Sequence, residues 1–154
     1  MGGVPKRLGE LLTERKLITE EQLQRALEEQ KRSGDFLGEV LIRRGYIKEQ
    51  DLLTALSEQY DIPFVSLRDK YIDWNLVKRF TPSLILDHKC FPLAENEFAL
   101  TVAVVNPLDV WVLKKAEEEA RGLKLKLVLV SRADMSDVIE RYRQFAKGGI
   151  SKLF

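Results

Sequence analysis

An internal repeat in the first sixty residues constrains the fold of this chain more than any other feature. Residues 7–30 and residues 36–59 form two blocks of 24 residues, and twelve aligned positions are identical. A five-residue connector, residues 31–35, separates the two copies. Identity at this density indicates two copies of one supersecondary unit, neither of which buries its apolar face alone.

Each copy is predicted to form a short helix, a turn and a longer helix. Leucines at helical i, i+3, i+4 spacing share one face of the short helix in the first copy. Thr19, three residues before Gln22, predicts a capping box at the start of the longer helix. Gly45 is predicted at the C-terminal end of the short helix in the second copy. Two such units related by a pseudo-twofold axis would pack into a small helical bundle.

The second half of the chain has a different pattern, which predicts a small α/β lobe. An extended segment near Pro63 is followed by short helices, a hairpin around residues 96–97, a helix ending near Gly122, an alternating strand over residues 123–130 and a last helix to about Phe145. We therefore expect an α+β protein in which a helical bundle of two tandem helix-turn-helix repeats precedes a lobe with a short antiparallel sheet. The expected parts are residues 1–60, residues 61–146 and a linker or tail over residues 147–154.

Composition excludes several classes of function. Charged residues make up 32% of the chain, but the formal net charge is only +1, so no DNA or RNA partner is expected. No segment approaches the ~20 apolar residues of a membrane span, so we expect a cytoplasmic protein. The lone Cys90 is predicted to be a small buried hydrophobe.

Catalytic and metal-binding motifs are missing from the sequence. Gly148, Gly149 and Lys152 lack the spacing of a phosphate-binding G-x-x-x-x-G-K-[ST] loop. A single histidine and a single cysteine provide neither a metal cluster nor a nucleophile with its base. We therefore expect no enzymatic activity, no catalytic residue, no metal and no cofactor.

The two blocks resemble the MshEN domain, the N-terminal domain of type II secretion and type IV pilus assembly ATPases. Its signature is two copies of R-L-G-x-x-[LVI]-[LVI]-x-x-G-[LVI]-[LVI]-x4-L-x3-L-x2-Q separated by five residues. A looser resemblance of the second half extends the similarity to about residues 7–145. The matching positions are Arg7, Leu8, Gly9, Leu12, Leu17, Ile18, Leu23, Leu27 and Gln30 in the first copy, and Leu37, Gly38, Leu41, Ile42, Gly45, Ile47, Leu52, Leu56 and Gln59 in the second.

The resemblance implies a regulatory domain that binds cyclic di-GMP, a twofold-symmetric dinucleotide, and signals to a motor ATPase. Leucines would cover the guanine bases, glutamines would meet their polar edges, and glycines would let the backbone approach the ligand. The implied partners are a C-terminal ATPase domain of the same or another chain and an inner-membrane secretion platform protein. The ligand residues implied are Arg7, Leu8, Gly9, Leu23, Leu27, Gln30, Leu37, Gly38, Leu52, Leu56 and Gln59.

The sequence departs from the signature at four positions. Thr13 and Tyr46 replace aliphatic residues, Lys16 replaces glycine, and Phe36 stands where the second copy should have arginine. Phenylalanine can stack on a base but cannot meet a phosphate charge, and one lost charge-assisted contact costs roughly 1.5–3 kcal/mol. Two functions therefore stay open: a cyclic di-GMP sensor, and a module that docks the ATPase on the secretion platform without binding nucleotide.

Two polar residues in the second half have alternative interpretations. Asn106 and Asp109 lie in the turn before the helix that ends near Gly122. They either cap that helix or contact the ligand.

Overall fold

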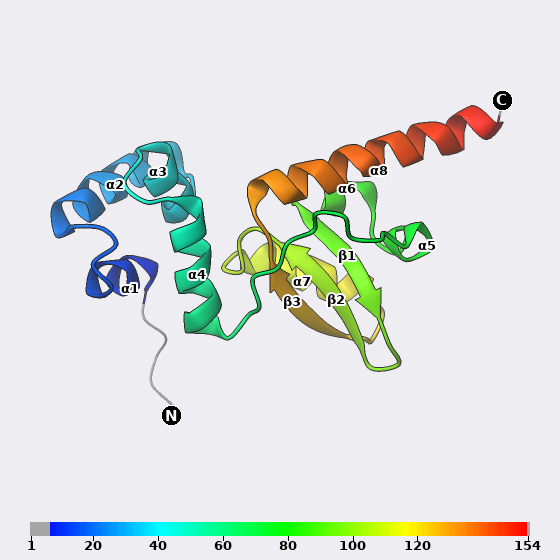
Figure 1. Cartoon of the computed structure of the whole chain (residues 1–154), viewed down its shortest axis with the longest axis horizontal. Helices are drawn as coiled ribbons and strands as arrows, with labels where there is room; N and C mark the ends of the chain where they lie inside the picture. Colours follow the sequence, from blue (N-terminus) through cyan, green and yellow to red (C-terminus); the bar gives the residue numbers. More distant parts are fainter. Residues whose placement is uncertain (1–6, 154) are drawn as a thin grey trace. The chain divides into compact units, whose positions relative to one another are not determined.

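A computed structural model describes residues 7–153, with side chains described as far as Gly148. The chain divides into two compact units that meet between Asp61 and Ile62, one residue beyond the boundary expected from the sequence. Figure 1 shows the helices and strands of both units.

The first unit consists of four helices, two from each copy of the repeat. They are α1 (Leu8–Glu14), α2 (Glu20–Ser33), α3 (Leu37–Arg43) and α4 (Glu49–Tyr60). The predicted pattern of a short helix followed by a longer one is confirmed in both copies.

The repeat extends to backbone dihedral angles at equivalent positions. Arg7 and Phe36, the N-caps of α1 and α3, have φ/ψ of −65°/149° and −66°/145°. In the turns that follow, Lys16 and Gly45 both adopt the left-handed region, with φ of 61° and 75°. Gly45 therefore ends α3 as predicted, and Lys16 adopts the same conformation although the signature has glycine there.

Most helix–helix contacts of the bundle lie between the copies, although α1 also packs on α2 of its own copy. Helix α2 contacts α3, and α1 contacts α4, so each short helix packs against the long helix of the other copy. Each copy therefore covers the apolar face of the other, as the repeat predicted. The buried apolar side chains are Leu11, Leu12, Ile18, Leu23, Ala26, Val40, Leu41, Ile47, Leu52, Leu53, Ala55 and Leu56.

The second unit places helices around a three-stranded sheet. Its elements are α5 (Trp74–Val77), α6 (Pro82–Leu86), β1 (Cys90–Glu95), β2 (Ala99–Val104), α7 (Val110–Glu119), β3 (Lys124–Leu129) and α8 (Arg132–Leu153). The strand order is β1-β2-β3, with β1 antiparallel to β2 and β2 parallel to β3. The sheet is thus mixed: the predicted antiparallel arrangement is confirmed for β1 and β2, whereas β3 lies parallel to β2. Helix α7 carries the chain back to the starting end of β2, which makes the next strand parallel.

Two turns in this unit are held by asparagine and aspartate side chains. Oδ1 of Asn106 accepts a hydrogen bond from the Leu108 amide at 2.9 Å. Asp109 is the N-cap of α7 and accepts one from the Val112 amide at 3.2 Å. Both residues therefore have the turn and capping roles that were one of the two interpretations of the sequence.

The last helix is longer than the sequence predicted. Helix α8 runs to Leu153, whereas the sequence pattern ended it near Phe145, so the tail expected to be a linker is helical to that residue. Glycine weakens a helix by about 1 kcal/mol but does not end one unless a cap or proline follows. Near the predicted end, the Phe145 ring stacks on Trp74 with centroids 4.7 Å apart.

Cys90 is fully buried at the start of β1. Burial, with the nearby negative charge of Glu119 as a smaller cause, raises the pKa of its thiol to about 12. The side chain is therefore a small core hydrophobe, as predicted. Over the residues that the structure describes, no helix is both long and apolar enough to cross a membrane.

The capping box of α2 has no counterpart in the second copy, which provides an internal comparison. The Thr19 hydroxyl accepts from the Gln22 amide at 3.1 Å, and Oε1 of Gln22 accepts from the Thr19 amide at 2.9 Å. Lys48, the equivalent N-cap of α4, has an extended backbone but makes no side-chain cap.

We expect Thr19→Ala to lower the free energy of unfolding by about 1 kcal/mol and Lys48→Thr to raise it by about 0.5–1 kcal/mol. The physical reason is one amide of the first helical turn losing or gaining a hydrogen-bond acceptor. Urea unfolding of the two variants beside the parent chain measures both changes. Equal stability of all three proteins would contradict the prediction.

Candidate functional site

Two glycines bring each short helix onto a leucine of its own copy. A Cβ atom at Gly9 would lie 2.7 Å from Cδ1 of Leu23, and one at Gly38 would lie 3.0 Å from Cδ2 of Leu52. Cδ2 of Leu8 lies 3.8 Å from the same point at Gly38. The structure therefore groups Gly9 with Leu23, and Gly38 with Leu52 and Leu8, and close packing by itself accounts for both glycines.

The six leucines implied as ligand contacts fall into two classes. Leu23, Leu52 and Leu56 are at most 7% exposed and belong to the bundle core. The half-buried members are Leu8, Leu27 and Leu37. Only this second class has apolar surface available for another molecule.

The polar residues of the implied site are free to bind. Arg7 is exposed at the N-cap of α1, whereas Gln30 and Gln59 are half-buried near the ends of α2 and α4. Within residues 7–153, the side chains of these three residues make no hydrogen bond or ion pair with the protein. At the position equivalent to Arg7, Phe36 is 44% exposed. These donors and acceptors are therefore available to a ligand.

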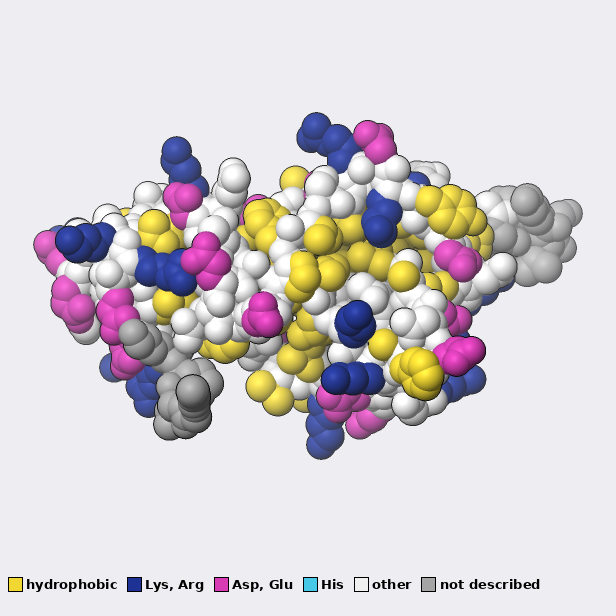
Figure 2. All heavy atoms as spheres, turned by 60° about the horizontal axis from the view of Figure 1, so that its bottom comes forward, with side chains coloured by type: hydrophobic (Ala, Val, Ile, Leu, Met, Phe, Trp, Pro, Cys, Tyr) yellow, Lys and Arg dark blue, Asp and Glu magenta, His cyan; other side chains and the backbone are white. Residues whose placement is uncertain are grey.

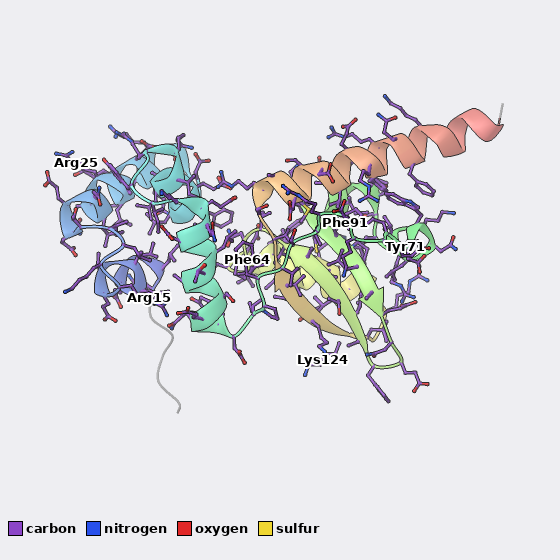
Figure 3. The ribbon with its side chains drawn as sticks, in the orientation of Figure 1. Arg15, Arg25, Phe64, Tyr71, Phe91 and Lys124 are labelled. Atoms are coloured by element: carbon purple, nitrogen blue, oxygen red, sulfur yellow. The ribbon has the colours of Figure 1, made fainter. Side chains whose placement is uncertain are left out.

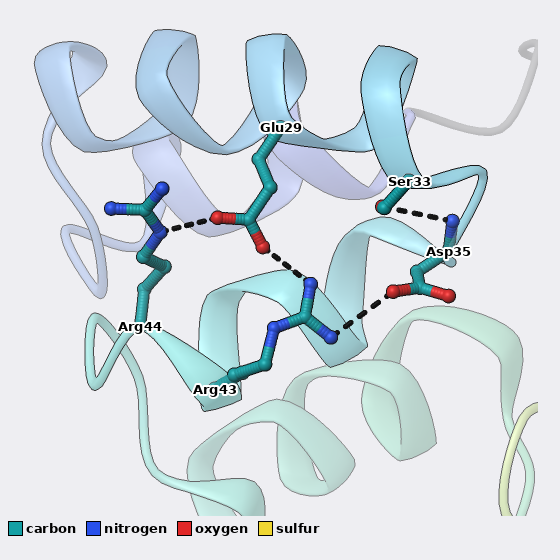
Figure 4. Close-up of polar contacts among 5 residues, drawn as sticks. All are labelled: Glu29, Ser33, Asp35, Arg43 and Arg44. Atoms are coloured by element: carbon teal, nitrogen blue, oxygen red, sulfur yellow. Dashed lines mark hydrogen bonds and ion pairs between the residues drawn. The ribbon is translucent and has the colours of Figure 1, made fainter.

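Two reciprocal ion pairs join the copies (Figure 4 shows one of them). Glu29 of α2 pairs with Arg44 at the end of α3, and Glu58 of α4 pairs with Arg15 at the end of α1. Glu58 is the repeat equivalent of Glu29, and Arg44 is that of Arg15. A twofold axis requires such exchanged contacts, because it carries Glu29 onto Glu58 and Arg44 onto Arg15, and so turns one ion pair into the other.

The pair at Glu29 extends into a larger cluster that lacks a counterpart at Glu58 within the described residues. Arg43 donates to Glu29 and also to Oδ2 of Asp35 at 3.1 Å (Figure 4). Hydrogen bonds from Arg43, and then from Arg44, lower the pKa of Glu29, and the bond to Glu29 is the main cause of a raised Arg43 pKa. The position equivalent to Arg43 in the first copy is Glu14, so the extra pair cannot form there.

Sequence reasoning missed these pairs. Arg15, Glu29, Arg44 and Glu58 are identical positions of the repeat but fall outside the signature. The available signal was that an arginine and a glutamate, opposite in charge, are each retained in both copies. That signal cannot show whether the pairs form within a copy or between copies.

A shallow cavity of about 330 Å³ lies between the copies. Its lining residues are Arg15, Leu17, Asp51, Thr54 and Ala55. None of the implied ligand residues lines it. Across the described part of the chain, no group of histidine, cysteine, aspartate or glutamate side chains could hold a metal ion.

The lowered pKa of Glu29 has a consequence for stability against pH. A carboxylate stabilised in the folded state contributes above its unfolded pKa, near 4.5 here, and loses that contribution as the pH falls through the folded value. We expect Glu29→Gln to be less stable than the parent chain at pH 7, with a difference that shrinks below about pH 4.5. Urea unfolding across this range measures the difference.

Glu28→Gln is the matched control, because Glu28 is exposed on the same helix and has no partner within the described residues. It should follow the parent profile. Parallel pH profiles for Glu29→Gln and the parent would show that the negative charge of Glu29 does not stabilise the folded state.

Comparison with known proteins gives matches in sequence and in structure. The family model of the MshEN domain matches residues 60–149, which leaves the tandem repeat outside the matched range. The type IV pilus assembly ATPase PilB of Myxococcus xanthus (strain DK1622) is 31% identical over 136 residues, 88% of this chain and 24% of the relative. The chain thus spans about a quarter of the length of this curated relative.

Solved structures extend the similarity to the first unit. A structure of MshE with cyclic di-GMP (cdg) has a TM-score of 0.79 at 27% identity and covers 89% of this chain and 99% of that one. The N-terminal domain of XpsE has a TM-score of 0.73 at 25% identity, covering 92% and 98%. Coverage this high must include most of the first unit, because the second comprises residues 62–154 alone. From the family match over more than half of its length, together with these structures, the chain belongs to the MshEN domain family.

Proposed function

We propose that this chain is the non-catalytic, regulatory N-terminal domain of a type II secretion or type IV pilus ATPase, and that it binds cyclic di-GMP through its tandem repeat. The observation that carries the proposal is the set of polar side chains of Arg7, Gln30 and Gln59, which have no partner within residues 7–153, in a pseudo-twofold bundle. The MshE structure, which contains this ligand at 27% identity to this chain, supports it independently.

The chemistry of the repeat suits a ligand with two equal halves. Half-buried Leu8, Leu27 and Leu37 offer apolar surface for the guanine bases. Each glutamine presents two donors and an acceptor in one plane, which matches the polar edge of a base. Arg7 offers a planar fork to a phosphate or to a guanine edge. The remaining residues implied as contacts, the glycines and buried leucines, give the helices their close spacing.

Regulation would act on domains outside this chain. The curated relative is an ATPase about four times as long as the matched region. The motor activity would therefore belong to a C-terminal ATPase domain of the same or another chain. Ligand binding in the repeat would change how this domain contacts that motor or an inner-membrane platform protein. In this function the domain works in the cytoplasm and reaches the membrane only through partners.

Exposed Phe36 favours a second candidate function. It is 44% exposed where the signature has arginine, so the second copy presents an aromatic ring in place of a charge. Aromatic side chains are enriched at protein interfaces. The second candidate is therefore a module that docks the ATPase on its platform without binding nucleotide.

Calorimetric titration of cyclic di-GMP separates the two candidates. We expect saturable binding at micromolar or lower concentration, and at least tenfold weaker binding for Arg7→Ala and for Gln30→Ala, since each loses a polar contact. Gln24→Ala is the matched control, because Gln24 is an exposed glutamine of the same helix outside the signature. No heat change at high ligand concentration in the parent chain would leave docking as the function.

Phe36→Arg restores the missing charge of the second copy. If the site binds the dinucleotide, this variant should bind about ten- to a hundredfold tighter, equivalent to one charge-assisted contact of roughly 1.5–3 kcal/mol. Titration of the variant beside the parent chain measures the change. Unchanged or weaker binding would mean that the Phe36 ring itself contacts the ligand.

A further inference from the structure

Strand β3 has one side that the sheet leaves open. The Lys124 amide donates to the Phe98 carbonyl at 2.9 Å. The backbone N–H and C=O groups of the even-numbered residues of this strand therefore point toward β2. The Leu129 amide donates to the Pro63 carbonyl at 2.7 Å, on the opposite side. Because backbone groups alternate along a strand, Leu125 and Leu127 point their N–H and C=O groups away from β2.

Within the described residues, backbone pairing reaches only one end of this edge. Residues 63–65 lie parallel to the strand at Leu129, where the Val65 amide donates to its carbonyl at 2.9 Å, and Phe64 forms an isolated bridge. Beyond that point Leu67 bonds to Asp134 of α8, and the chain before Ile62 enters α4. No described residue bonds to the backbone of Leu125 or Leu127 on the open side.

Side chains along the edge alternate in chemistry. Lys124 and Lys126 are exposed on one face of the strand, and Leu125 and Leu127 are half-buried on the other. Neither lysine makes an ion pair within the described part of the chain. Figure 3 places Lys124 and Phe64 toward opposite ends of β3, and Figure 2 shows hydrophobic side chains gathered over the second unit with lysine and arginine side chains among them.

We propose that this edge, residues 124–128, is a docking site for an extended acidic segment of a partner protein, which adds a strand to the sheet. Unpaired N–H and C=O groups are a template for strand addition. Alternate acidic side chains of the added strand would meet Lys124 and Lys126, and apolar ones would cover Leu125 and Leu127. A second copy of this chain is a poor occupant, because pairing two such edges would bring lysine against lysine.

The test uses two blocked hexapeptides as probes, one of alternating glutamate and valine and one of alternating lysine and valine. Amide chemical shifts of the full chain are followed during titration with each. We expect the acidic peptide to bind at least tenfold more tightly and to shift the amides of Leu125 and Leu127. Equal binding of the two peptides, or shifts elsewhere only, would overturn the proposal.

Variants separate strand addition from general charge attraction. Lys124→Glu/Lys126→Glu should reverse the preference, whereas Lys114→Glu/Lys147→Glu, with the same change in net charge at exposed positions off the sheet, should keep it. Leu127→Pro removes an N–H that the fold does not use and should weaken the acidic peptide at least tenfold. An unchanged spectrum away from β3 establishes that this variant is folded, and undiminished binding by it would overturn the proposal.

Discussion

The exchange of partners between the two repeat copies is the constraint on which the first unit depends. Each short helix packs against the long helix of the other copy, and the pairs Glu29–Arg44 and Glu58–Arg15 follow the same exchange. Partly exposed ion pairs such as these contribute modest stability, so most of the free energy of folding comes from the buried leucines. The ion pairs follow the exchange but do not select it, because the same arginine and glutamate are present in both copies and could also pair within a copy. Under the proposed function, this exchange would give the bundle two equivalent halves that suit a twofold ligand.

Local features of the fold were predictable because they depend on neighbouring residues. The helices of each copy, the capping box at Thr19 and the left-handed Gly45 all follow from spacing within a few positions. The direction of β3 was not predictable in the same way. Alternation of lysine and leucine shows which face of the strand is buried, but not whether the strand runs parallel or antiparallel to its neighbour. The exchanged ion pairs were missed for a related reason: identical charges in two copies do not show which copy each one meets.

Prediction of the site divides in the same way. The signature residues lie on the bundle, yet Gly9, Gly38, Leu23 and Leu52 have a sufficient explanation in helix packing. A match to the signature at such positions is evidence for the fold of the bundle and does not by itself show that a ligand binds. The family model, which matches residues 60–149, is independent of these positions. Specific evidence for binding therefore rests on the polar groups that the fold itself leaves unused.

Phe36 makes the two halves of that surface unequal while leaving the backbone equal. Its φ and ψ differ from those of Arg7 by 1° and 4°, so the side chain changes the chemistry of the position and not its geometry. With phenylalanine in place of arginine, a symmetric ligand would lack one charge-assisted contact in the second copy, which would weaken its binding, while the contacts of the first copy would remain. An asymmetric site of this kind would bind the ligand more weakly, but the contacts of the first copy would still favour binding. The same exposed ring gives a protein partner a contact that arginine would not provide, so sensing and docking can share one surface.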